Sequence, residues 1–173
     1  MAYPVKPMRG GTPLNGLYHR LASSPDWVCE AKLDGVRAFW DGEELWSRTG
    51  NKLPRCENVK KHLPRSLQLD GELVYGKDSE PTRYWVFDFA GPKGFDRLAA
   101  FYTDRRAVIA DLLNALKPAC GDVVKLTPYV TWDDVERLGL EGVVFKKKDS
   151  LYEMAHRPGV KVSYWVKFRR NEP

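Results

Sequence analysis

One segment of the chain combines the residue types from which a covalent nucleophile can be built, EAKLDGVR at residues 30–37. A lysine amine attacks an electrophile only when it is unprotonated, and neighbouring cations favour the unprotonated form. Arg37 supplies one such cation to Lys32, and Gly35 lets the backbone between them turn sharply or approach a ligand closely. The segment therefore predicts a nucleophilic Lys32. The alternative is a charged β-turn in which Lys32 and Arg37 are solvated.

Further segments along the chain favour the nucleophile. They are SRTGN at 47–51, DGEL at 70–73, YWVFDF at 84–89, EGVVFK at 141–146 and YWVKFR at 164–169. Together with the first segment they resemble motifs I, Ia, III, IIIa, IV and V of the covalent nucleotidyltransferases, which include ATP-dependent DNA ligases, RNA ligases and mRNA-capping enzymes. One match alone would be weak, but the whole set occurs in the family's order. The forms of motif I and of the Phe87-Asp88 pair are closest to the DNA ligases.

The resemblance implies a catalytic set for attack on the α-phosphate of ATP. Lys32 would be the nucleophile and would become a lysyl-AMP phosphoramidate, while Lys167 would neutralise charge on the α-phosphate. Glu141 would hold the divalent metal, and Mg²⁺ (or Mn²⁺) suits oxygen ligands beside a triphosphate.

The resemblance also implies a set of nucleotide-binding residues: Glu30, Ala31, Arg37, Arg48, Glu72, Phe87, Lys146 and Arg169. Phe87 would stack on the adenine ring, although packing in the core is its ordinary role. Glu72 would accept a hydrogen bond from the ribose, and Arg37 and Arg48 would contact sugar or phosphate. Glu30 would accept from the adenine amino group, with help from the backbone at Ala31.

The chain departs from the ligase pattern in two respects. Motif V usually offers two lysines, but Arg169 stands at the second position; it keeps the charge with a different shape and reach. The family continues past motif V into an OB-fold domain, whereas this chain ends at Pro173. We therefore expect residues 1–173 to be a nucleotidyltransferase (adenylation) domain without the C-terminal OB-fold domain.

Composition agrees with a polyanionic partner. The formal net charge is +5 and the pI is about 9.1, with basic clusters at residues 146–148 and at Lys167, Arg169 and Arg170. A solvated surface is the alternative for these clusters. The three widely spaced cysteines do not indicate a disulfide framework or a zinc site, and no apolar run reaches the length of a membrane span. We expect a location in the cytoplasm of a bacterial or phage-infected cell, or otherwise inside a cell.

The hydrophobic pattern predicts an α+β fold. Strands are expected at 27–32, 37–40, 44–47, 67–75, 84–89, 123–129, 142–147 and 163–169, and helices at 14–21, 57–63, 104–116 and 132–138. The third of these helices would be capped by Thr103 and stopped by Pro118, and a Thr131–Asp134 capping box would open the fourth. Few βαβ alternations indicate mostly antiparallel sheets. The resemblance implies the same: a nucleotidyltransferase (ATP-grasp-like) domain of two sheets with flanking helices.

These patterns predict an ATP-dependent DNA ligase, or its adenylation domain. Its expected partners are ATP and nicked duplex DNA, with no membrane. We expect a monomer, and a partner protein is one candidate for supplying DNA clamping. An RNA ligase or an mRNA-capping guanylyltransferase is the alternative within the same class. A non-catalytic nucleic-acid-binding module that kept the fold is the alternative from another class.

Overall fold

The computed structural model describes residues 6–7, 9–11, 16–77, 80–94, 97–155 and 161–170. Its helices are α1 (Leu17–Ala22), α2 (Glu57–Lys60), α3 (Tyr102–Cys120) and α4 (Trp132–Leu138). Among the described residues, no helix combines the length and the apolar character needed to cross a membrane.

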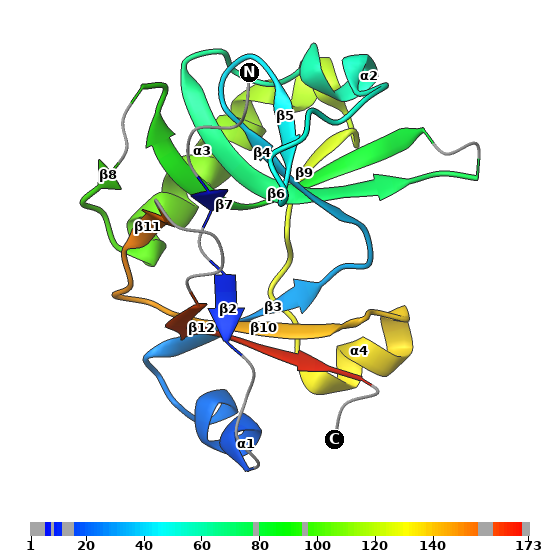
Figure 1. Ribbon diagram of the computed structural model, residues 1–173. Helices are drawn as coiled ribbons and strands as arrows, with labels where there is room; N and C mark the ends of the chain where they lie inside the picture. The colour runs from blue at the N-terminus through cyan, green and yellow to red at the C-terminus, as the bar shows by residue number, and fades with distance from the viewer. Residues whose placement is uncertain are drawn as a thin grey trace.

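Two β-sheets form the body of the molecule and lie one above the other in Figure 1. The five-stranded sheet has the order β5-β4-β6-β7-β9, with β4 Val36–Trp40, β5 Leu45–Ser47, β6 Leu67–Tyr75, β7 Pro81–Pro92 and β9 Val124–Leu126. The four-stranded sheet has the order β2-β12-β10-β3, with β2 Arg9–Gly11, β3 Trp27–Lys32, β10 Gly142–Lys147 and β12 Lys161–Arg169. Strands β1 Lys6–Pro7, β8 Arg97–Leu98 and β11 Tyr152–Ala155 form a small third sheet.

The predicted α+β architecture, two mostly antiparallel sheets with flanking helices, is confirmed. Neighbouring strands of both main sheets run antiparallel except for the pairs β7–β9 and β12–β2. The strands of the small third sheet were not predicted, nor was β2. They are too short to produce an alternating pattern in the sequence.

Helix α3 covers the five-stranded sheet. Ile109 and Leu113 are four residues apart, so they lie on one face of the helix, and both are buried in the same core as Leu69, Leu73 and Val86 of the sheet. Because this core continues through β6 and β7, α3 fixes the strands that carry one wall of the pocket described below.

The four-stranded sheet has its own core beneath α1 and α4. Leu21 of α1 and Val135 of α4 are buried together with Val143 and Phe145 of the central strand β10. Each main sheet is therefore packed by separate helices. A further buried cluster joins the two sheets, with Phe39 and Ala90 of the five-stranded sheet against Val162 and Trp165 of the four-stranded sheet.

The helix boundaries partly agree with the sequence. Thr131 and Asp134 form the predicted capping box at α4. For α3 both predicted limits are wrong: Phe101, not Thr103, is the N-cap and accepts the first helical bond at 3.0 Å, and the helix continues past Pro118. A proline in the last turn forfeits one hydrogen bond, a small loss for a helix held by packing on a sheet.

The segment between β3 and β4 passes from one main sheet to the other. At Gly35 an added Cβ would lie 2.4 Å from the carbonyl oxygen of Leu73 in β6, so no larger residue fits without a shift of the backbone. This crossing places Lys32, at the end of β3, and Arg37, in β4, on opposite walls of the space between the sheets.

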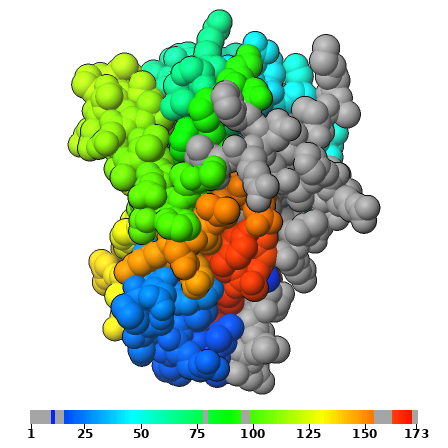
Figure 2. Space-filling model, turned by 90° about the vertical axis from the view of Figure 1, so that its left-hand side faces the viewer, coloured from blue at the N-terminus to red at the C-terminus, as the bar shows by residue number. Residues whose placement is uncertain are grey.

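A buried ion pair joins α3 to the five-stranded sheet. Arg105 donates from Nε to Oδ1 of Asp88 at 2.7 Å and from Nη2 to Oδ2 at 3.1 Å, and both side chains are fully buried. Its Nη1 also donates to the carbonyl of Ser150 at 2.6 Å. Figure 2 shows the start of α3 (green) packed against the segment that follows β10 (orange).

We expect Arg105→Met to lower the free energy of unfolding by about 3–5 kcal/mol, because the change leaves the buried Asp88 carboxylate without its partner. Urea unfolding measures the loss. Lys93→Met is the matched control, since Lys93 pairs with Glu43 at the surface with 42% of its side chain exposed, and such pairs contribute about 1 kcal/mol or less. Equal effects of the two substitutions would contradict the assignment.

Candidate active site

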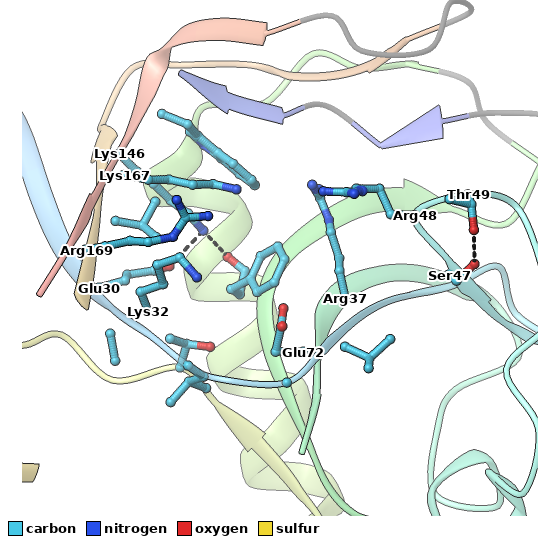
Figure 3. Close-up of a pocket in the computed structure, with 18 residues that line it drawn as sticks. Glu30, Lys32, Arg37, Ser47, Arg48, Thr49, Glu72, Lys146, Lys167 and Arg169 are labelled. Carbon is cyan, nitrogen blue, oxygen red and sulfur yellow. Dashed lines mark hydrogen bonds and ion pairs between the residues drawn. The ribbon is translucent and has the colours of Figure 1, made fainter. Parts of the chain in front are cut away.

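A cavity of about 450 Å³ lies between the two main sheets. The four-stranded sheet contributes the wall that carries Lys32, Lys146, Lys167 and Arg169, and the five-stranded sheet with its loops contributes Arg37, Arg48, Glu72 and Phe87. Figure 3 shows Lys32 and Lys167 on one side of the cavity and Arg37 and Arg48 on the other.

The structure brings the predicted residues together. All the residues predicted to bind the nucleotide, and both predicted catalytic lysines, line this cavity. Glu141 does not line it but lies directly beside it, in contact with Lys32. The alternative of a solvated turn is wrong, because the Lys32 and Arg37 side chains are only 15% and 12% exposed and both are paired.

Lys32 and Arg169 share one carboxylate. Lys32 Nζ forms an ion pair with Oε2 of Glu141, and Arg169 Nε donates to Oε1 of the same carboxylate at 3.0 Å. Strand register explains the arrangement, because Gly142 of β10 is paired with Lys32 on β3 and with Arg169 on β12. The nucleophile predicted from motif I is therefore held beside the carboxylate of motif IV.

On the opposite wall, Arg37 is held by Asp70. Its Nε donates to Oδ1 of Asp70 at 3.0 Å, Nη2 contacts Oδ2, and the Tyr152 hydroxyl donates to Oδ2 at 2.6 Å. The Asp70 carboxylate raises the pKa of Arg37 against the effect of burial, so this guanidinium stays charged. Arg37 Cζ lies 5.5 Å from the centroid of the Phe87 ring, at the edge of the cation–π range.

Phe87 is half-buried, and its ring packs edge-on against Trp165 with centroids 5.8 Å apart. Its backbone carbonyl accepts a hydrogen bond from Lys146 Nζ at 2.5 Å. The same ammonium forms an ion pair with Oε2 of Glu30 at 2.8 Å. Lys146 thus lines the cavity while its charge is already balanced inside the protein.

The rest of the 146–148 cluster favours the alternative of an ordinary surface. Lys147 Nζ pairs with the exposed Asp149 at 3.0 Å, and Lys148 Nζ donates to the carbonyl of Pro25.

Glu30 lies at the floor of the cavity and is only 1% exposed. Besides Lys146, its carboxylate accepts hydrogen bonds at Oε1 from the Tyr102 hydroxyl and from Arg106 Nη1. Burial and the adjacent Glu30 carboxylate raise the pKa of Tyr102, which keeps this hydroxyl protonated as a donor. Sequence reasoning missed Tyr102, Arg106 and the cavity residue Thr127, because none of them lies in a motif.

Glu72 also lines the cavity, on the wall formed by the five-stranded sheet. Burial raises its pKa to about 7, although the nearby cations Lys32, Arg37 and Lys167 oppose the rise. A carboxyl group with this pKa exchanges its proton near neutrality, so it can either accept or donate a hydrogen bond to a bound hydroxyl group.

We expect the wild-type protein to lose stability relative to Glu72→Gln as the pH rises from 4.5 to about 7. In this window the folded protein keeps the Glu72 proton that the unfolded chain releases. Because the folded state binds more protons, its free energy of unfolding falls as the pH rises. Urea unfolding at about pH 5 and about pH 8 measures the difference between the two proteins. A difference that does not change with pH would contradict the prediction; Glu43→Gln, at an exposed carboxylate, is the control.

No family model matches the chain. It is similar in sequence to the multifunctional non-homologous end joining protein LigD of Mycolicibacterium smegmatis, at 29% identity over 164 aligned residues covering 82% of this chain and 21% of that protein. It is also 29% identical to a DNA ligase of Haemophilus influenzae over 161 aligned residues, covering 79% of this chain and 58% of that ligase. The chain thus spans about a fifth to three fifths of the length of these relatives.

Solved structures give the same result for the fold. A mycobacterial DNA ligase D complexed with ATP and MES matches with a TM-score of 0.72 and 24% identity, covering 96% of this chain and 60% of that one. The Chlorella virus DNA ligase-adenylate matches with a TM-score of 0.71 and 17% identity, covering 95% of this chain and 69% of that one. The chain is therefore similar in sequence to proteins named as DNA ligases, and it shares the fold of solved DNA ligase structures.

Proposed function

We propose that this chain is the adenylation domain of an ATP-dependent DNA ligase and that it transfers AMP from ATP to Lys32. The observation that carries the proposal is the position of Lys32 between a carboxylate and a cavity lined with cations. A triphosphate brings concentrated negative charge, and the cations Lys167, Arg169 and Arg48 would offset it. The ligases to which the chain is similar support the same chemistry.

In the first step Lys32 Nζ would attack the α-phosphorus of ATP. A P–N bond forms, the bond from the α-phosphorus to the bridging oxygen breaks, and pyrophosphate leaves with the electron pair. Lys167, which Figure 3 shows reaching into the cavity, would stabilise the charge that builds up on the α-phosphate oxygens. The proton of the lysine would pass to solvent or to the pyrophosphate.

The residues fit a divalent metal at Glu141. Mg²⁺ (or Mn²⁺) is commonly bound by one or two carboxylates together with substrate phosphates and water, and Glu141 offers one carboxylate beside the point of attack. When bound, the ion would supply positive charge to the phosphate oxygens. Glu141 would then exchange part of its contact with Lys32 and Arg169 for the metal.

The later steps would use the charged lysine on DNA. AMP would pass from Lys32 to the 5′-phosphate at a nick in duplex DNA, and the neighbouring 3′-hydroxyl would displace AMP to form the phosphodiester. We propose that the chain works as a monomer inside the cell. An OB-fold domain or a partner protein would clamp the duplex, because the curated relatives extend well beyond the matched region.

The first test is the intact mass of the protein after incubation with Mg²⁺ and either ATP or GTP. We expect a gain of one AMP with ATP alone, and no gain in Lys32→Ala. A GMP adduct would instead indicate a capping guanylyltransferase, and sealing of RNA ends only would indicate an RNA ligase. Salt-sensitive DNA binding without any adduct would support a non-catalytic binding module.

We expect Lys167→Met to slow the charging of Lys32 about a hundredfold or more, which is the usual loss when a preorganised group that stabilises the transition state is removed. Single-turnover labelling with radioactive ATP measures the rate. Lys147→Met removes an equal charge from the exposed pair with Asp149 and should leave the rate unchanged. Similar rates for the two variants would exclude the assigned role of Lys167.

A further inference from the structure

The floor of the cavity is formed by a segment that crosses between the two main sheets after β9. Thr127 N donates to the carbonyl of Val86 in the five-stranded sheet at 2.9 Å. The next carbonyl, that of Pro128, accepts from Ala31 N in the four-stranded sheet at 3.0 Å. In Figure 1 this segment runs in yellow from β9 down to α4. Thr127, in this segment, lines the cavity and is therefore within reach of a ligand held between the two walls.

Thr127 carries a polar group that the protein itself does not use. Its side chain lines the cavity and the residue is only 1% exposed, and within the described part of the chain its hydroxyl has no hydrogen-bond partner. Both of its backbone groups are occupied, since N–H donates to Val86 and the carbonyl accepts from Arg106 Nη2 at 2.6 Å. Buried polar groups without a partner are rare, and one in the wall of a binding cavity points to a ligand as the missing partner.

We propose that Thr127 reads the edge of the nucleobase and that Arg106 is a positioning residue for it. This inference rests on the proposed function, because it assigns the base-binding end of the same cavity. Arg106 joins Glu30 and Thr127, both of which line the cavity, and Phe87 in the same lining offers a ring face for stacking. The ligand class is a purine nucleotide with an exocyclic amino group at position 6.

Arg106 connects the two reading groups. Its Nη1 donates to Oε1 of Glu30 and its Nη2 to the carbonyl of Thr127, so one planar guanidinium holds both sides of the floor. The guanidinium also lies over the exposed ring of Tyr129, 4.2 Å from its centroid. These contacts fix the distance between the Glu30 carboxylate and the Thr127 hydroxyl.

The donors already present at the floor determine what it can recognise. Glu30 Oε1 accepts from two donors, whereas Oε2 is paired only with Lys146 among the described residues and keeps an acceptor site. The Thr127 hydroxyl can also accept, after a rotation about its Cα–Cβ bond that turns it into the cavity. Two acceptors side by side match the two hydrogens of an amino group and disfavour the 6-oxo group of guanine or hypoxanthine.

The experiment compares ATP with purine riboside 5′-triphosphate, which lacks the 6-amino group, by calorimetric titration in a Lys32→Ala background that cannot be charged. We expect Thr127→Val to weaken ATP binding about tenfold, the usual scale for losing one hydrogen bond to a ligand, and to leave the analogue unchanged. The urea midpoint should not fall, because the valine removes a hydroxyl that has no partner in the free protein.

Two further variants sharpen the test. Thr82→Val is the matched control, since its exposed hydroxyl donates to the carbonyl of Val74 outside the cavity and its loss should change neither affinity. Arg106→Lys, which cannot bridge Glu30 and Thr127, should lower the ratio of ATP to analogue affinity while Thr127 is intact. A purely structural role of Arg106 would weaken both nucleotides equally.

The outcomes separate this inference from the proposed function. If Thr127→Val leaves the affinity ratio unchanged while the wild-type protein acquires AMP, the inference is wrong and the function stands. If ATP binds with a ratio that depends on Thr127 but no adduct forms on wild-type Lys32, the inference stands and the proposed transfer is wrong. No detectable binding of ATP in the Lys32→Ala background overturns the inference.

Discussion

A chain of alternating charges runs beneath the cavity and joins the three layers of the molecule. Glu30 of β3 pairs with Lys146 of β10, Lys146 Nζ lies 3.9 Å from Asp88 of β7, and Asp88 pairs with Arg105 of α3. None of the four side chains is more than 2% exposed. At this depth an unpaired charge is costly, so each member requires its neighbours and the relative position of the sheets is fixed with them.

This network also determines which basic residues face the ligand. Lys146 is the fifth residue after Glu141 in the same segment, yet its ammonium is buried. Lys146 Nζ lies 4.3 Å from the centroid of the Trp165 ring and 4.9 Å from that of the Phe87 ring. Lys32 and Arg169 also line the cavity, and they share the Glu141 carboxylate. The charge of Lys146 is balanced by the buried Glu30 carboxylate. The charges of Lys32 and Arg169 are balanced by the Glu141 carboxylate, which a metal ion can also bind.

The cavity is therefore lined by two chemically different groups of residues. Lys32, Lys167 and Arg169 are cationic and suit phosphate, whereas Glu30 and Thr127 present oxygen acceptors and suit a base. The crossing at Gly35 separates Lys32 and Arg37 onto opposite walls, so a nucleotide between the sheets contacts both. A nucleotide bound in this direction would bring its α-phosphate toward the lysine.

The sequence by itself determined the strands of both main sheets except β2, and the cationic residues that line the cavity. A strand is indicated by apolar residues that alternate over a few positions. The Thr131–Asp134 capping box and each motif segment likewise lie within a few consecutive residues. The class of fold and the gathering of Lys32, Lys167 and Glu72 could be predicted from such patterns.

Only the tertiary structure decided what lies at the floor. Tyr102 and Arg106 reach Glu30 from a segment more than seventy residues away, Arg106 also bonds the Thr127 carbonyl, and no local pattern marks contacts of that kind. The start of α3 at Tyr102, its passage beyond Pro118, and the burial of Lys146 depend equally on packing against the sheets. Propensity and spacing act over a few residues, whereas burial and charge pairing are settled only when distant segments meet.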